Sequence, residues 1–261
     1  MIMVFICSSV LICSALDCEL NVIGTITVDK LGTGNFTTIQ GAIVSVLFNN
    51  NRWIRISIKP GIYIEGVRID QHKPCILLEG KYYEHVNDGT LIILDNHQVD
   101  PSVYHQIVGD KASFRSCGFF SLQDTLWDQN GRHYFNQCYI QGAVDFIFGR
   151  GQSIYEGCIV NVTAQGLKPS NDLAMVVFKN ANVVGNGLAY LGRAYGPYSR
   201  VIFVRSFLSQ VVVPQGWDAW NYTGHEIKLH WTRSDTSKCV TWEKKISDSQ
   251  LMDLTQISFI D

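Results

Sequence analysis

The sequence has few charged residues and no long run of either sign. Charged side chains make up 17% of the 261 residues, and the formal net charge is -2. Domains that bind nucleic acid generally present a basic face, so this composition gives no support for a nucleic-acid partner. The sequence also lacks Gly-x-Ser-x-Gly, His-Glu-x-x-His, Cys-x-x-Cys and P-loop motifs. We therefore predict no cofactor and no bound metal.

Long apolar segments are missing beyond the N-terminus. Residues 1–16 carry no charge, and Cys13-Ser14-Ala15 offers a cleavage site with small side chains. This segment is typical of a secretory signal peptide and is too short to span a bilayer comfortably, so we predict secretion and no membrane anchor. An apolar N-terminal strand or a wrongly assigned start site is the alternative, because the usual basic residues are absent.

The cysteines fit an extracellular protein. Two of the eight, Cys7 and Cys13, lie within the predicted signal peptide, so six would remain in the mature chain. An even number permits disulfides but does not identify a pair. The histidines are scattered, and His105 and His133 are interpreted as surface or turn residues.

Three segments repeat at an interval of about 20 residues. Phe114-Arg-Ser-Cys117, Phe135-Asn-Gln-Cys138 and Tyr155-Glu-Gly-Cys158 align, so that their cysteines are 21 and then 20 residues apart. Weaker copies follow at Val177-Phe178-Lys-Asn and Val204-Arg-Ser-Phe207. Short β-branched and aromatic runs at this period, without a convincing amphipathic helix between them, are typical of a solenoid of stacked strands.

The repeat predicts an all-β protein folded as a right-handed parallel β-helix, with a single domain over residues 17–261. Neighbouring turns of such a solenoid lie about 4.8 Å apart. The three repeated cysteines would then form an inward ladder of small apolar side chains, with a disulfide or metal role as the alternative. Residues 39–47 have the amphipathic pattern of a helix that caps the open end. The irregular residues after Gly224 are expected to form a tail packed on the solenoid.

Two aspartates follow the repeat in the same register. Asp124 comes seven residues after Cys117, and Asp145 comes seven residues after Cys138. On adjacent turns they would nearly touch, which would raise the pKa of one carboxyl and leave an acid and a base or nucleophile at one site. Asp145 also lies within an apolar strand and needs a partner, for which Arg193 is a candidate. Solvated turn aspartates are the alternative.

Four motifs stand in order along the chain: Gly61-Ile-Tyr63-Ile-Glu65, Gln123-Asp124-Thr-Leu, Gly142-Ala-Val-Asp145-Phe-Ile-Phe-Gly149 and Leu191-Gly-Arg193. Together they resemble the motifs of the plant pectin methylesterase (pectinesterase) family, in its short form without an N-terminal inhibitor-like region. The resemblance runs from about Ile26 to the C-terminus. It implies a carboxylic ester hydrolase that removes methyl esters from homogalacturonan and acts in the plant cell wall.

The resemblance also implies a role for individual residues. By its position, Asp145 would be the nucleophile on the ester carbonyl and Asp124 the general acid and base. Gln123 would donate a hydrogen bond to the developing oxyanion, and Arg193 would orient Asp145. The family places aromatic side chains along its cleft, and the candidates are Phe146, Tyr134 and Tyr195. Solenoid packing is the alternative for each of these three.

The chain departs from the family pattern in places. Pro101 stands where a second oxyanion glutamine is expected, and Gln106 is out of register to replace it, which predicts impaired turnover. Residues 80–101 look about one turn short, which predicts a break in the stack beside the site, and the chain stops before the customary end. These departures leave two alternatives: an inactive relative that only binds pectin or a proteinaceous inhibitor, and a β-helix polysaccharide lyase. We predict a monomer.

Overall fold

The computed structural model describes residues 18–80, 91–94, 105–163, 172–193, 200–225, 230–232 and 247–255. The predicted signal peptide lies outside these residues. Two α-helices are described, α1 (Ile39–Ser45) and α2 (Asp248–Thr255), with a short 3₁₀ helix η1 (Trp220–Tyr222). Neither described helix is long and apolar enough to cross a membrane.

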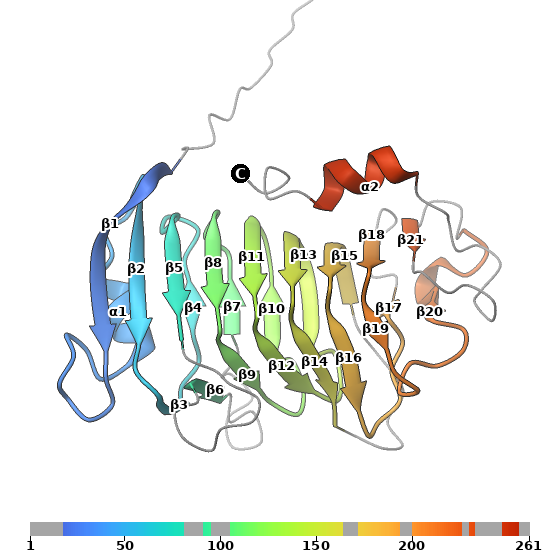
Figure 1. Ribbon diagram of the computed structural model, residues 1–261, viewed down its shortest axis with the longest axis horizontal. Helices are drawn as coiled ribbons and strands as arrows, with labels where there is room; N and C mark the ends of the chain where they lie inside the picture. Colours follow the sequence, from blue (N-terminus) through green and yellow to red (C-terminus); the bar gives the residue numbers. More distant parts are fainter. Residues whose placement is uncertain are drawn as a thin grey trace, which may run out of the picture.

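The strands pair in parallel in a 14-stranded and a 7-stranded sheet, which confirms the predicted all-β parallel β-helix (Figure 1). The larger sheet covers two faces of the solenoid, named sheet 1 and sheet 3, and the smaller one is sheet 2. Sheet 1 holds β1 (Glu19–Val28), β2 (Arg52–Ile58), β5 (Ile76–Glu79), β8 (Ala112–Arg115), β11 (Arg132–Asn136), β13 (Ile147–Glu156), β15 (Asp172–Lys179), β18 (Arg200–Val204) and β21 (His230–Thr232). Sheet 2 holds β3 (Gly61–Ile64), β6 (Leu91–Leu94), β9 (Gly118–Phe120), β12 (Tyr139–Gly142), β14 (Ile159–Val162), β16 (Asn182–Gly185) and β19 (Phe207–Leu208).

Sheet 3 carries the candidate site. Its own strands are β4 (Arg68–Ile69), β7 (His105–Ile107), β10 (Leu126–Asp128), β17 (Gly192–Arg193) and β20 (Trp217–Asp218). The first residues of β13 and β15 complete it, because these two strands begin in sheet 3 and continue into sheet 1.

The stack is not interrupted beside the site. Strands β5, β6 and β7 each pair with one strand on either side, so they form a complete turn between β2–β4 and β8–β10. The expected break in the stack is therefore wrong. Residues 81–90 and 95–104 lie outside the described residues, and the shortening relative to the family stays a prediction.

The residues that repeat in the sequence form the inner wall of the solenoid. Five aromatic rings from sheet 1 stack in one column with centroid separations of 4.3 to 5.0 Å: Phe114, Phe135, Tyr155, Phe178 and Phe203. Stacked rings one strand spacing apart bury apolar surface and hold the register of neighbouring turns. The fifth copy of the repeat is centred on Phe203, which pairs with Phe178. The weak copy Val204-Arg-Ser-Phe207 lies on this turn, with Val204 opposite Lys179 and Phe207 opposite Asn182, so Phe207 falls outside the aromatic column and is exposed.

The cysteine ladder is confirmed. Cys117, Cys138 and Cys158 are free thiols with at most 1% exposure in the core, and burial raises the pKa of Cys117 and Cys158. Cys18 and Cys75 form a disulfide, a pairing that the sequence left open. It ties the start of β1 to the residue before β5.

The predicted capping helix is α1. Thr38 caps it by accepting a hydrogen bond from the amide of Gly41, and Ile39, Ala42 and Ile43 are buried against the first turns. Glu65, from the Gly61–Glu65 motif, accepts hydrogen bonds from the amides of Ile39 and Gln40. A carboxylate at the helix N-terminus satisfies otherwise unpaired amides and interacts favourably with the helix dipole.

Candidate active site

The two aspartates occupy one corner of the solenoid, between sheet 2 and sheet 3. Leu126 of β10 pairs with Ile147 of β13, so Asp124 and Asp145, each two residues earlier, stand at the same position on adjacent turns. The amide of Asp124 donates to the carbonyl of Val144 at 3.1 Å, which joins the two corners. The predicted register is therefore confirmed.

Both aspartates have left-handed backbone conformations, with φ of 54° at Asp124 and 46° at Asp145. Aspartate and asparagine tolerate this region better than other residues with a β-carbon. The turn directs both side chains to the outer surface, where they line one pocket of about 550 Å³. The other lining residues are Gln123, Trp127, Gln129, Asn130, Phe148, Gly149 and Arg150.

Arg193 makes the predicted ion pair with Asp145. Its Nη2 atom donates to Oδ1 of Asp145 at 3.0 Å, and both side chains are largely shielded, with exposures of 17% and 23%. The guanidinium also lies over the ring of Trp220, 4.5 Å from its centroid. A charge-assisted bond together with a cation–π contact fixes the plane of the guanidinium and, through it, the orientation of the Asp145 carboxylate.

An aromatic pair forms the floor of the pocket. Trp127 and Phe148 face outward from paired positions of β10 and β13, and their rings stack with centroids 5.8 Å apart. Neither was among the predicted site residues. The signal that would have found them is strand alternation, since each lies one residue after a buried aliphatic residue, Leu126 or Ile147.

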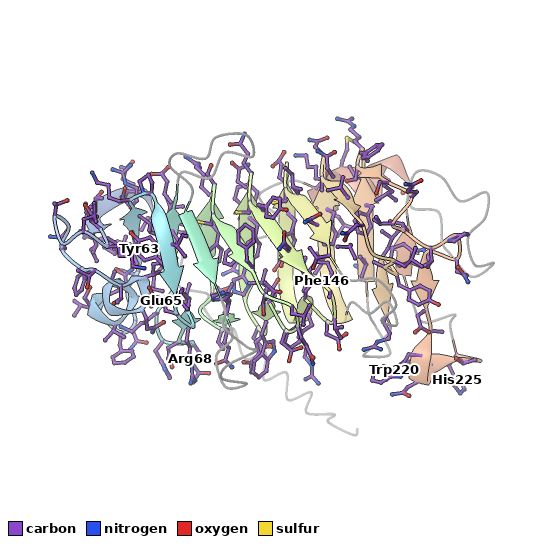
Figure 2. All side chains as sticks on the ribbon, turned by 90° about the horizontal axis from the view of Figure 1, so that it is seen from below. Tyr63, Glu65, Arg68, Phe146, Trp220 and His225 are labelled. Carbon is purple, nitrogen blue, oxygen red and sulfur yellow. A yellow bond between two sulfur atoms is a disulfide. The ribbon has the colours of Figure 1, made fainter. Side chains whose placement is uncertain are left out.

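Two predicted aromatic contacts of the substrate do not reach the pocket. Phe146 is 1% exposed and belongs to the core (Figure 2). The chain turns at Asp145, so the next two residues both point inward and the outward aromatic residue is Phe148. Tyr134 lies on sheet 1 instead, where its hydroxyl donates to Glu156 at 2.7 Å and its ring packs on a cluster with Ile154. The packing alternative holds for both residues.

The other predicted site residues lie in different parts of the chain. Gln123 lines the pocket from the residue before Asp124. Tyr195 and Pro101 lie outside the described residues. Gln106 is opposite Trp127 rather than at the aspartate corner, and its amide donates to Gln129, which agrees with its being out of register as a second oxyanion donor.

His105 and His133 are buried, contrary to their interpretation as surface or turn residues. His133 lies between two acceptors, the carboxylate of Asp128 at Nδ1 and the carbonyl of Gly109 at Nε2. Tyr155 donates to the other oxygen of the same carboxylate at 3.0 Å. This buried network lies directly behind the pocket wall, because Asp128 stands between Trp127 and Gln129.

The side chains that line the pocket determine which chemistry it can perform. Among the residues that the structure describes, no group of three or more His, Cys, Asp or Glu side chains is placed to hold a metal ion. The arrangement instead offers two neighbouring carboxylates, one of them ion-paired, beside an amide donor and an aromatic floor. Such a site suits covalent and general acid–base chemistry at a carbonyl group.

The comparisons with known proteins agree with this assignment. The family model described as Pectinesterase matches residues 92–261. The chain is 41% identical to "Probable pectinesterase 29" of Arabidopsis thaliana, over 90% of this chain and 86% of that protein. It is 42% identical to "Probable pectinesterase 55" of the same plant, over 90% and 88%.

Solved structures show the same fold. Pectin methylesterase from carrot superposes with a TM-score of 0.72 at 22% sequence identity, covering 93% of this chain and 95% of that one. A pectin methylesterase in complex with a hexasaccharide superposes with a TM-score of 0.63 at 17% identity, covering 93% and 98%. With the family model and the relatives above 30% identity, these findings establish that the chain belongs to the pectinesterase family.

Proposed function

We propose that this chain hydrolyses the methyl esters of homogalacturonan, the polyuronide backbone of pectin, and releases methanol. The main support for this proposal is that Asp124 and Asp145 share one register position and line the same pocket. Membership of the pectinesterase family supports the reaction class. Pectin is supported as the substrate by the pectinesterases of Arabidopsis thaliana that the chain resembles and by the pectin methylesterase solved with a hexasaccharide.

In the first half of the reaction, a carboxylate oxygen of Asp145 attacks the C6 carbonyl of a methylated galacturonate. Arg193 orients this carboxylate through the bond to Oδ1. The bond to the methoxy group then breaks, and methanol leaves with the proton of Asp124. The product of this step is an acyl-enzyme, a mixed anhydride between the sugar carboxyl and Asp145.

In the second half, the Asp124 carboxylate takes a proton from water while the water oxygen attacks the acyl carbonyl. The anhydride bond breaks, which restores the Asp145 carboxylate and frees the uronic acid. Gln123, which precedes Asp124 and lines the same pocket, donates a hydrogen bond to the oxyanion that forms in both halves. Trp127 and Phe148 provide the flat apolar surface for the sugar rings.

The test is methanol release from highly methylated pectin by the purified chain and by Asp145→Asn. This substitution keeps the shape of the side chain and removes the nucleophile, so we expect a loss of at least about 1,000-fold. Circular dichroism and the melting temperature of the variant show whether the β-helix is intact. Unchanged methanol release by a folded Asp145→Asn protein would contradict the proposal.

A catalytically impaired homologue is the second candidate, favoured by Pro101 at the position of the second oxyanion glutamine. Loss of one such donor costs about 100- to 1,000-fold in turnover. We expect Pro101→Gln to raise methanol release over the parent chain. Pectin binding without methanol release in either protein would select the impaired homologue, and unsaturated sugar products would select a polysaccharide lyase.

We further propose that the chain is secreted to the plant cell wall, acts there as a monomer and has a proteinaceous inhibitor as its partner. The disulfide between Cys18 and Cys75 supports an oxidising compartment. Expression with a C-terminal fluorescent tag in plant cells tests the location. Retention of the tag inside the cell would contradict it.

A further inference from the structure

The first turn of the solenoid leaves one edge of sheet 1 open. Strand β1 pairs with β2 on one side, and among the strands that the structure describes none pairs with its other side. Val28 accepts a hydrogen bond from the amide of Lys59 on the β2 side, so by the alternation of a parallel strand Thr25 and Thr27 direct their backbone groups to the open side. Ile23 of the same strand is 53% exposed. Open strand edges pair with other chains unless they are protected.

Asn35 takes the place of a neighbouring strand at part of this edge. Its amide donates to the carbonyl of Thr27 at 2.7 Å, and its Oδ1 atom accepts from the amide of Thr27 at 2.8 Å. The carbonyl of Phe36 accepts from the amide of Asp29 at 2.8 Å. The loop lies so close to β1 that a Cβ atom on Gly34 would be 2.6 Å from the carbonyl oxygen of Thr27. Asn35 is therefore held firmly against the strand.

The nitrogen of the Asn35 side chain points away from the protein. Because Oδ1 faces Thr27, the planar amide directs Nδ2 away from β1, and Nδ2 has no hydrogen-bond partner among the residues that the structure describes. Both Asn35 and Thr37 are exposed. Asn35-Phe36-Thr37 also has the acceptor sequence for N-linked glycosylation.

Two further acceptor sequences begin at Asn161 and Asn221. Asn161 lies within sheet 2 between Gln141 and a residue of β16, and its Nδ2 atom donates to Gln141 at 2.9 Å. Asn221 is exposed but follows Trp220, which lies at the end of the solenoid opposite to Tyr63 (Figure 2). Of the three, Asn35 alone combines a side-chain nitrogen directed to solvent with an open strand edge.

We infer that Asn35 carries an N-linked glycan, which shields the open edge of β1 from pairing with a second copy of this chain. The inference rests on the proposed secretion, because the glycan is transferred in the secretory pathway. Nδ2 bonds to C1 of the first N-acetylglucosamine of a lipid-linked oligosaccharide, the bond from C1 to the lipid pyrophosphate breaks, and Nδ2 loses one proton. Oδ1 is unchanged by this transfer, so its bond with Thr27 persists.

The position of the glycan suits this shielding role. Thr25, whose backbone groups face the open side, lies two residues before Thr27, or about 6.6 Å along the strand. A glycan is bulky and well solvated, so one that begins at Asn35 excludes another strand from this part of the edge. A second copy that paired through β1 would also cover Ile23, and the glycan keeps this apolar side chain from such a contact.

The first experiment measures the modification. The full chain is expressed in plant cells, and the peptide that contains Asn35 is analysed by mass spectrometry before and after treatment with a peptide N-glycosidase. We expect a glycan on this peptide and conversion of the asparagine to aspartate by the enzyme. Thr37→Ala removes the acceptor sequence and leaves the bonds between Asn35 and Thr27, so it should abolish the glycan.

The location of the protein separates the two proposals. Unmodified Asn35 in protein collected from the medium would overturn the glycan and leave secretion standing. Unmodified Asn35 in protein retained in the cytosol would overturn both. Methanol release should be the same with and without Thr37→Ala, because Thr37 does not line the pocket, so the result does not depend on the esterase.

The second experiment measures association by sedimentation velocity over a range of protein concentrations. We expect the glycosylated chain to remain a monomer, and the Thr37→Ala protein to shift toward the sedimentation coefficient of a dimer as its concentration rises. The matched control is Asn221→Gln, which removes an acceptor sequence at the other end and should stay monomeric. Adding Ile23→Lys to Thr37→Ala places a charge on the edge strand and should restore the monomer.

Two results would contradict the shielding role. One is a Thr37→Ala protein that lacks the glycan and remains a monomer at every concentration. The other is a dimer that persists when Ile23→Lys is added, because its contact would then lie away from the edge of β1.

Discussion

Gly149 shows how a single residue shapes the pocket wall. Its φ is 131°, a region that residues with a side chain rarely adopt, and a Cβ atom there would overlap the carbonyl oxygen of Asp128 on the turn below. The glycine that ends this motif is therefore required by the backbone. Close approach of two turns brings Phe148 beside Trp127.

We expect Gly149→Ala to lower the free energy of unfolding by about 3 kcal/mol, because it combines backbone strain with a clash between neighbouring turns. The matched control is Gly157→Asn. Gly157 has φ of 64°, and Asn180 holds the equivalent corner with φ of 52°, so this change should cost less than about 1 kcal/mol. Urea denaturation of the two variants measures the difference, and equal losses would contradict the prediction.

The ion pair of Asp110 and Arg132 makes the stability of the fold depend on pH. Asp110 accepts hydrogen bonds from the amide of Arg132 at 2.9 Å and from its Nε at 3.0 Å. Burial by itself raises the pKa of Asp110, but the hydrogen bonds and the charge of Arg132 outweigh it and hold this pKa below its ordinary value. A carboxyl with a lowered pKa stabilises the fold above its unfolded-state pKa and loses that contribution as the pH falls through the folded value.

We therefore expect Arg132→Gln to destabilise the protein by about 1 kcal/mol at pH 7, a modest value because both side chains are partly exposed. The difference from the parent chain should begin to shrink as the pH falls below the unfolded-state pKa of about 4, and it should vanish once the pH has passed the lower folded-state pKa of Asp110 in the parent. Urea denaturation at several pH values measures it. A difference that stays constant down to about pH 2 would show that the pair contributes through packing alone.

At the level of strands and turns, the buried network of Asp128, His133 and Tyr155 joins β10, β11 and β13 behind the pocket. Both ring nitrogens of His133 face acceptors, so the ring donates from both positions when it carries both protons. Tyr155 contributes its hydroxyl to Asp128 and its ring to the aromatic column. The network thus connects the inner wall of the solenoid to the strand that carries Trp127.

We expect His133→Leu to cost about 3 to 5 kcal/mol in the free energy of unfolding, because it leaves a buried carboxylate without its main partner. Tyr155→Phe keeps the stacked ring and removes one hydrogen bond, so it should cost only about 1 to 1.5 kcal/mol. Thermal and urea denaturation of both variants provide the measurement. A larger loss from Tyr155→Phe than from His133→Leu would refute this ranking.

For the whole molecule, the elongated shape means that each turn contacts only its neighbours (Figure 1). Solenoids of this kind unfold locally from their ends more readily than compact domains do. Helix α1 and the disulfide between Cys18 and Cys75 protect one end, where the bridge spans 57 residues of sequence. Helix α2 packs near sheet 1, where Lys179 donates to the carbonyl of Thr255 at 3.4 Å.

We expect the double substitution of Cys18 and Cys75 by serine to lower stability by about 4 kcal/mol, the chain-entropy value for a loop of this length. The loss should be local, because the bridge joins only the first turns. Hydrogen exchange should therefore speed up in β1 and β2 and remain slow in β11 and β13. Uniform loss of protection across the solenoid would instead indicate that the disulfide supports the whole stack.

The sequence by itself determined the repeat and the register that depends on it. A 20-residue period of cysteine and aromatic residues is enough to predict stacked parallel strands, because each turn must bury the same positions. The alignment of Asp124 with Asp145 comes from the same period, and the motifs indicated the pectinesterase family and the partner Arg193. All of these features depend on the order of residues along the chain, because equivalent positions on successive turns of a solenoid lie next to each other.

Only the tertiary structure decided from which residue the strand alternation must be counted, and therefore which side chains face the pocket. Alternation counted from Asp145 fails at the corner, where a left-handed residue lets Phe146 and Ile147 both point inward, so the outward aromatic residue is Phe148. Tyr134 fits the strand alternation, but it lies on sheet 1 and not on sheet 3, because the chain changes direction between β10 and β11. The burial of His133 depends on neighbours from other turns, and such contacts leave no local signature in the sequence.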